Sequence, residues 1–175
     1  MGGITLPQGQ HTIIKNTLQG CLVGISLNAG PRTVMTNNRI AENTVENCAV
    51  NCIALIASSG VRLTNTQVSS NSLSDSTVGN GIVLQVDGGA VSSNLILDII
   101  FFDNFLNGIF LWPGANDNRV FNNEFRTNNL AALAGAAAGR CRPLQRPGAV
   151  PVGPLGTGRG DNGPGGGHLS GDREQ

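Results

Sequence analysis

A short motif recurs five times in this sequence, and its spacing limits what the chain can fold into. A glycine or cysteine is followed by isoleucine, any residue and leucine at 3–6, 24–27, 52–55, 81–84 and 108–111. The starts of successive copies lie 21, 28, 29 and 27 residues apart. A fixed period of roughly 20–50 residues is the signature of repeat architectures. The chain is therefore expected to fold as a stack of similar units.

A second element lies between copies of this motif and also follows the last copy. It reads apolar, two residues, asparagine, one residue, apolar, two residues, then a small or polar residue, and it occurs at 13–21, 40–48, 68–76 and 120–128. In the repeat that ends at residue 111, the same reading of 97–105 puts Ile100 where asparagine is expected. A frame that uses Asn104 fits as well, so both registers stay open.

Each repeat holds three short apolar segments with in-and-out alternation, which is typical of strands rather than helices. Three strands per repeat, joined by bends, make one coil of a parallel β-helix, in which equivalent residues stack about 4.8 Å apart. We therefore predict an all-β fold: a single-stranded parallel β-helix of four to five coils over residues 3–130, with little helix.

Stacking of equivalent residues gives the asparagines a role. An inward asparagine at a bend tolerates the left-handed backbone region and bonds neighbouring main-chain groups. We expect a ladder formed by Asn16, Asn43, Asn71 and Asn123 and interrupted at Ile100, whereas Asn94 is expected in an inserted loop. Two aliphatic columns should fill the core: Ile25, Ile53, Ile82 and Ile109, and Leu27, Leu55, Leu84 and Leu111.

These motifs resemble the right-handed β-helix repeats of the pectin-lyase-like superfamily. They are most similar to the short repeats of carbohydrate-binding and sugar-hydrolysis domains and of periplasmic accessory proteins of nitrous oxide reductase. The resemblance implies an extracellular or periplasmic protein, although the start of this chain has no signal-peptide pattern. It also implies that a polysaccharide would lie along the outer face of one parallel sheet.

If the five-fold motif forms that sheet, its outward column is Thr5, Ser26, Ala54, Val83 and Phe110. The next outward column then holds Asn28, Ile56, Gln85 or Val86, and Trp112. Phe110 and Trp112 are expected to stack on sugar rings, with Asn28 and Gln85 donating and accepting hydrogen bonds on neighbouring coils. The alternative is that the C-terminal segment or a nearby loop covers the two aromatic rings.

This face has no carboxylate, whereas glycoside hydrolysis needs two carboxyl groups and calcium-assisted lyases need clustered acids. His11 is the only histidine before residue 130 and Met35 the only internal methionine. We therefore expect no catalytic residues, no metal site and no cofactor. The formal net charge is zero and no apolar run approaches the roughly 18 residues of a membrane span, so neither nucleic acid nor a membrane is an expected partner.

The cysteines raise a separate question. Cys21 and Cys48 have the same offset in consecutive repeats, which places their Cα atoms about 5 Å apart and within disulfide range. Stacked buried thiols are the favoured interpretation, and a disulfide stays open.

Composition divides the chain. Residues 1–130 hold 19 asparagines and residues 131–175 hold one, so we assign 1–130 to the repeats and 131–138 to an alanine-rich helical turn or cap. Residues 139–175, rich in glycine, proline and arginine, are expected to be a disordered tail. The abrupt change suggests a fragment of a longer protein with an out-of-frame tail, and open β-helix ends suggest self-association.

The leading hypothesis is a non-catalytic segment, either a scaffold or a carbohydrate-binding piece of a secreted protein. One alternative is part of a polysaccharide lyase or hydrolase whose catalytic residues lie outside this chain. Another is a segment of an adhesin or tail spike.

Overall fold

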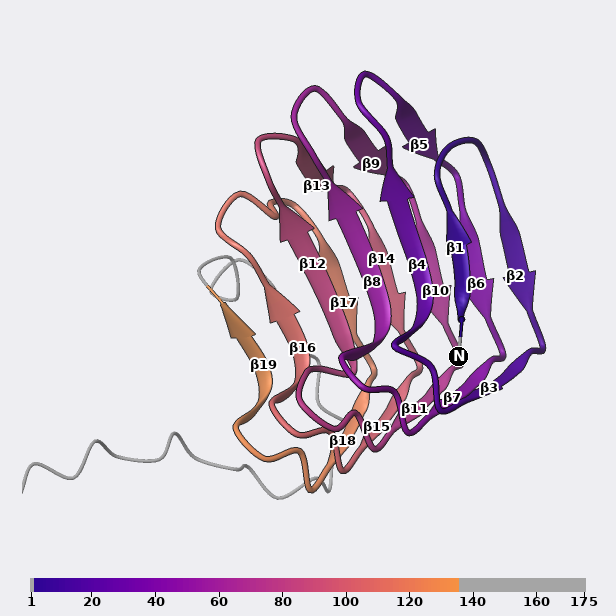
Figure 1. Ribbon diagram of the computed structural model, residues 1–175. Helices are drawn as coiled ribbons and strands as arrows, with labels where there is room; N and C mark the ends of the chain where they lie inside the picture. The colour runs from indigo at the N-terminus through magenta and orange to yellow at the C-terminus, as the bar shows by residue number, and fades with distance from the viewer. Residues whose placement is uncertain (1, 136–175) are drawn as a thin grey trace, which may run out of the picture.

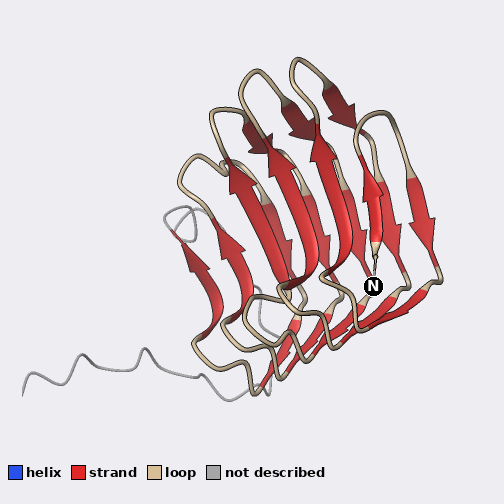
Figure 2. Ribbon diagram, in the orientation of Figure 1, coloured by secondary structure: helices blue, strands red, loops and turns tan. Residues whose placement is uncertain are grey.

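The computed structural model describes residues 2–135 as a stack of coils (Figure 1). Every regular element in that range is a strand (Figure 2), and none of these residues lies in a helix long and apolar enough to cross a membrane. The segment expected as a disordered tail, 139–175, lies outside the described residues.

Four sheets form the walls of the stack, and within each sheet neighbouring strands are parallel. Sheet A contains β1 (Ile4–Leu6), β4 (Val23–Ala29), β8 (Asn51–Ala57), β12 (Ile82–Val86), β16 (Asn107–Leu111) and β19 (Ala131–Gly135). Sheet B contains β2 (Thr12–Ile14), β6 (Arg39–Ala41), β10 (Gln67–Ser69), β14 (Leu95–Leu97) and β17 (Arg119–Phe121). Sheet C contains β3 (Thr17–Gln19), β7 (Thr44–Glu46), β11 (Ser72–Ser74), β15 (Ile100–Phe102) and β18 (Glu124–Arg126). Sheet D contains β5 (Val34–Thr36), β9 (Arg62–Thr64) and β13 (Ala90–Ser92).

This is the parallel β-solenoid that the repeat predicts. We number its coils by their strands: the first holds β2–β4, the second β5–β8, the third β9–β12, the fourth β13–β16 and the fifth β17–β19. Sheet D supplies a fourth short strand in three coils, which the three-strand prediction did not include.

Both predicted aliphatic columns are present. Ile53 pairs with Ile25 on one side and Ile82 on the other, and Ile82 pairs with Ile109. The leucine column runs in the same register, from Leu27 to Leu111, and the side chains of both columns are fully buried. Sheet A therefore sends one unbroken aliphatic wall into the core.

The described part of the alanine-rich segment, residues 131–135, is a strand and not a helical turn, whereas residues 136–138 lie outside the described residues. Residues 131–135 form β19, which pairs with β16 so that Leu133 faces Ile109 in register. Because the edge of β16 offers a row of backbone donors and acceptors, pairing there outweighs the helix propensity of alanine.

The corners between sheets share a two-residue pattern. The first residue has a left-handed backbone and points outward, as at Lys15, Glu42 and Ser70, where φ is 60°, 56° and 54°. The second points inward and belongs to a ladder. The left-handed conformation thus falls on the residue before each ladder asparagine and not on the asparagine itself, which corrects our expectation.

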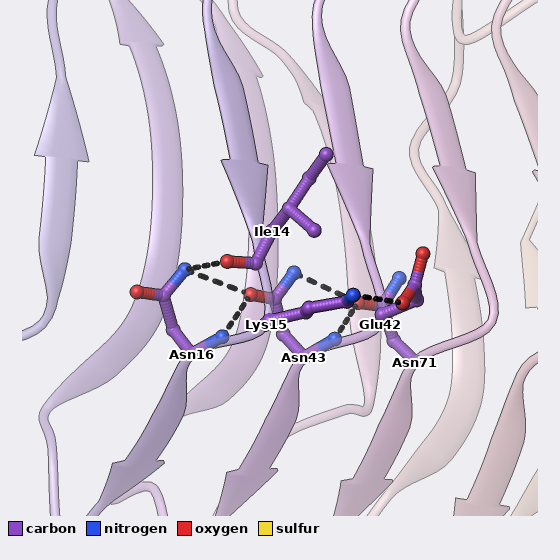
Figure 3. Close-up of polar contacts among 6 residues, drawn as sticks. All are labelled: Ile14, Lys15, Asn16, Glu42, Asn43 and Asn71. Atoms are coloured by element: carbon purple, nitrogen blue, oxygen red, sulfur yellow. Dashed lines mark hydrogen bonds and ion pairs between the residues drawn. The ribbon is translucent and has the colours of Figure 1, made fainter.

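The predicted ladder occupies the corner between sheets B and C (Figure 3). The backbone N–H and the Nδ2 of Asn43 both donate to Oδ1 of Asn71, at 2.9 and 3.0 Å. Asn16 makes the same pair of bonds to Oδ1 of Asn43, at 2.9 and 3.0 Å. Each amide of the ladder thereby takes up a buried backbone donor of the preceding coil.

The interruption in this ladder lies at Ile99 rather than at Ile100. Ser72 pairs with Ile100, which places Ile99 directly above Asn71, and the backbone N–H of Ile99 donates to Oδ1 of Asn123 at 3.0 Å. Ile99 is fully buried in the core, whereas Ile100 points outward. The sequence frame was therefore wrong by one residue.

Two further ladders flank the predicted one at a distance of five residues. The ladder before sheet B holds His11, Asn38, Thr66, Asn94 and Asn118. The ladder after sheet C holds Cys21, Cys48, Ser76, Asn104 and Asn128. Asn94 is therefore a buried ladder member, 1 % exposed, and not the loop residue we expected.

A fourth ladder lies at the N-terminal ends of the sheet A strands. Asn107 donates to Oδ1 of Asn80, and Asn80 donates to Oδ1 of Asn51. These bonds run toward the N-terminal coils, opposite to the direction in the other three ladders. The four ladders bracket the short strands and hold the coils in register.

The glycine of the five-fold motif makes room for side chains across the core. A Cβ added at Gly81 would lie 2.5 Å from Cδ1 of Phe101, and one added at Gly108 would lie 2.5 Å from Cδ1 of Phe125. The two rings stack at 4.8 Å between centroids and 6° between planes. Cys52 occupies the place of Gly81 one coil earlier. The sheet C residue in line with Phe101 and Phe125 is there Leu73, which is smaller than phenylalanine.

Removal of a ladder amide should destabilise the fold at either corner. We expect Asn43→Ala and Asn94→Ala each to lower the free energy of unfolding by about 1–3 kcal/mol, because each leaves buried backbone groups without partners. Urea unfolding of both variants measures this. The exposed Asn129→Ala is the control and should change stability little; similar losses in all three variants would contradict the ladder.

Replacement of the motif glycine should disturb the aromatic stack. Gly81→Ala is expected to cost about 1–3 kcal/mol through overpacking, and Phe101→Leu in the same chain should recover part of that loss. Gly30, around which an added Cβ meets nothing within 4 Å, supplies the control Gly30→Ala. Additive losses from Gly81→Ala and Phe101→Leu in a double-mutant cycle would show that the two positions do not share space.

Candidate functional site

The outer face of sheet A carries the predicted site residues in two parallel columns. Ser26, Ala54, Val83 and Phe110 follow one another in register in the first column. The second column holds Asn28, Ile56 and Gln85, and Trp112 continues it because its backbone N–H donates to the oxygen of Leu84 at 3.0 Å. Gln85, and not Val86, is therefore the outward neighbour of Trp112.

The size and exposure of the outward side chains on this face change from the first coil to the fourth. Ser26, Ala54 and Val83 are small side chains with exposed fractions of 7 %, 1 % and 4 %, so the first three coils present a shallow surface. In the fourth coil Phe110 is half-buried and Trp112 is 39 % exposed. The two rings therefore form the one aromatic step on the described part of this face.

A tight turn holds Trp112 at the end of β16. The carbonyl oxygen of Trp112 accepts a hydrogen bond from the N–H of Ala115 at 3.0 Å, and Gly114 has a φ of +91°. Proline followed by glycine at the two central positions is typical of a type II turn. A Cβ added at Gly114 would meet Cγ1 of Val86 at 3.4 Å, so the turn lies against the preceding coil.

The structure brings three of the four predicted residues together and separates the fourth. Phe110 and Trp112 lie two residues apart at the end of one strand, and Gln85 occupies the coil directly before them. Asn28 lies three coils from Trp112, a distance of about 14 Å along the stack, with Ile56 between it and Gln85. The expectation that Asn28 acts from a neighbouring coil is therefore corrected.

Support for Trp112 from outside the strand was not anticipated. The turn that follows Trp112 lies next to Val86 of the preceding coil and holds the backbone of the tryptophan. Its sequence signal, proline and glycine after the tryptophan, was visible. These residues make the aromatic step part of the scaffold.

Charged groups are sparse here. The outward residues of sheet A between Ile4 and Gly135 include no carboxylate, and Asp87 follows the end of β12 in an exposed loop. Within the described range no group of three or more histidine, cysteine, aspartate or glutamate side chains could hold a metal ion. His11 belongs to a ladder, where its backbone N–H donates to Oδ1 of Asn38 at 2.9 Å.

The cysteines form a separate buried cluster at the corner between sheets C and A. Cys21, Cys48 and Cys52 are free thiols, and Cys48 stacks on Cys21 in the third ladder. A hydrogen bond from Cys52 lowers the pKa of Cys48, and the same bond, together with burial, raises the pKa of Cys52. The favoured interpretation of Cys21 and Cys48 as stacked thiols agrees with the structure.

Comparison with known proteins identifies a family. A family model described as "Right handed beta helix region" matches residues 1–140. No curated protein and no solved structure gives a significant match.

Gly114 should control the position of the tryptophan. Alanine in this left-handed conformation is expected to cost about 1–2 kcal/mol and to loosen the turn, so Gly114→Ala should increase iodide quenching of Trp112 fluorescence. The chain contains one tryptophan, so the signal reports on this position alone. An unchanged quenching constant would show that the ring does not depend on the turn.

Proposed function

We propose a function from the premise that this chain belongs to the right-handed β-helix family. In our proposal it is a non-catalytic β-helix segment that binds a carbohydrate chain on the outer face of sheet A. We assign it, by the same family resemblance, to the extracellular or periplasmic space.

The aromatic step carries this proposal. Sugars offer an apolar ring face that stacks on aromatic side chains, and a partly exposed tryptophan provides such a platform. Trp112 is 39 % exposed, and Phe110, two residues earlier on the same face, is half-buried. Both are anchored by strand β16 and by the turn at Gly114, so little ordering is needed on binding.

Hydrogen bonds would come from the neighbouring coil. Gln85 is half-buried next to Trp112 in the same outward column, and its side-chain amide both donates and accepts, as sugar hydroxyl groups require. A glycan that runs along the column toward the N-terminal coils would cross Ile56 and reach Asn28. The long axis of the ligand would then lie parallel to the axis of the solenoid.

Binding without cleavage follows from the same face. General acid–base cleavage of a glycosidic bond needs two carboxyl groups within about 5–10 Å of each other, and the outward residues described on sheet A include none. A site made of two aromatic rings and an amide would hold an uncharged stretch of sugar. The proposal therefore favours a binding segment over part of a lyase or hydrolase.

Calorimetric titration with a panel of neutral and acidic oligosaccharides tests this function. We expect at least one to bind with a Kd in the micromolar to millimolar range, with a shift in Trp112 emission, and Trp112→Ala should weaken binding at least ten-fold. Phe105→Ala removes an aromatic ring that is 50 % exposed at another corner and serves as the control.

Other outcomes would redirect the proposal. A flat titration across the panel, with folded protein, would leave only a scaffold role. Release of unsaturated or reducing-end products from pectate, polygalacturonate or alginate by the pure protein, with or without calcium, would favour the enzyme alternative. We expect no such products.

A further inference from the structure

The fourth coil exposes apolar side chains on two sheets at once. On sheet C, Ile100 and Phe102 are outward and 40 % and 42 % exposed. On sheet B, Leu95 and Leu97 are outward and half-buried. One coil earlier the same four places hold Gln67, Ser69, Ser72 and Ser74. Sheet B also carries Ile14 and Phe121 outward, but among the described coils only the fourth is apolar on both faces. An exposed apolar band of this kind is typical of a surface that meets another protein.

From the second coil to the fourth, the outer faces of sheets B and C match in chemical character at each level. In the second coil sheet B presents Arg39 and sheet C presents Glu46, and neither forms an ion pair within the described residues. The third coil presents only amide and hydroxyl groups on both faces. In the fourth coil the two leucines of sheet B stand at the level of Ile100 and Phe102.

The fifth coil continues the match. Sheet B presents Arg119, whose guanidinium lies 5.7 Å from the centroid of Phe121. Sheet C presents Glu124 and Arg126, which pair with each other at the surface. Arg119 on sheet B of one copy would therefore pair with Glu124 on sheet C of the next copy, where Glu124 also pairs with Arg126 of its own chain. From the second coil to the fifth, sheet B thus presents basic, polar, apolar, and then basic and aromatic side chains. At the same levels sheet C presents acidic, polar and apolar side chains, and then one acidic and one basic side chain.

Because the residues of sheets B and C match within the same coil, two copies of the chain would have to meet with equal coils at equal height. A rotation about an axis parallel to the solenoid moves a copy of the chain sideways without changing the height of any coil. Each coil of one copy then meets the same coil of the next, and sheet B of one copy can face sheet C of its neighbour. We propose that this protein assembles with copies of itself in this way, as a ring in which the B face of each copy packs on the C face of the next.

A two-fold contact between C faces fits the residues less well. A two-fold axis through the fourth coil would reverse the height order, so the third coil of one copy would meet the fifth of the other. Among the described residues Glu46 would then have no basic partner, and Arg39 would take no part. A contact between two different faces does not close in a dimer, so the expected assembly has at least three copies.

Light scattering coupled to size exclusion tests the assembly with the full chain. At tens of micromolar and low salt we expect a mass at least three times that of one chain, which is 18.1 kDa. Ile100→Ser with Phe102→Ser copies the serines that the third coil has at these places, so the fold should tolerate both changes. This variant is expected to elute as a single chain. Val34→Ser, at a side chain 59 % exposed on sheet D, should leave the mass unchanged.

A charge exchange identifies the faces. Arg39→Glu alone and Glu46→Arg alone should each raise the dissociation constant of the assembly at least ten-fold at low salt, because each sets like charges opposite one another. The two changes in one chain should restore assembly. Circular dichroism of every variant confirms the fold.

Three results would overturn the proposal. The first is a single-chain mass for the native protein across the concentration range. The second is an assembly that survives the serine variant. The third is an assembly that ignores Arg39→Glu or is not restored by the double exchange, which would point to other faces.

Discussion

Side-chain amides at the corners carry the hydrogen bonds on which the solenoid depends. Strands of three residues in sheets B and C offer few backbone bonds of their own, and each inward corner would bury an N–H without a strand partner. At Asn43, one amide oxygen accepts from the backbone and the side chain of Asn16, while its own nitrogen reaches Ile13 and Asn71. Satisfying these groups at every coil fixes the register.

Register in turn determines what each face presents. Because the coils stack without slipping, every outward position belongs to one column, and a surface becomes a grid of columns and coils. Trp112 and Gln85 are neighbours on that grid although 27 residues separate them in the sequence. The face proposed to bind a glycan and the two faces proposed to contact other copies are different walls of the solenoid, so neither proposed role obstructs the other.

Much of this could be predicted from the sequence, since each column repeats one residue type. The isoleucine and leucine columns, the ladder through Asn16, Asn43 and Asn71, and the outward direction of Phe110 and Trp112 all followed from spacing. The ladder predictions were wrong where the residue type changes from one coil to the next within a column. The sequence pattern cannot distinguish Ile99 from Ile100, because both are isoleucine. The ladder that contains Asn94 also contains His11 and Thr66, so the sequence does not show it as a repeated asparagine.

Other features depend on contacts that no pattern reports. β19 forms because β16 offers it an edge, although its sequence is mostly alanine. The room that Gly81 leaves for Phe101 joins the start of a sheet A strand to a sheet C strand of the next coil. Cys52 completes a thiol cluster only because the corner after sheet C brings it back to Cys48. Each case needs the path of the chain in three dimensions.

The constant five-residue spacing of the corner ladders determines where this gene can change in length. In every coil from the first to the fifth, ladder positions such as 38, 43 and 48 or 118, 123 and 128 keep the same interval. An insertion inside that interval would turn one short strand inside out. The stretch from sheet A to the next sheet B strand varies between coils, from β8–β10 to β16–β17, and sheet D is absent from the fifth coil. Insertions and deletions should therefore accumulate on that side of the molecule, while the opposite corner tolerates only the loss or gain of a whole coil.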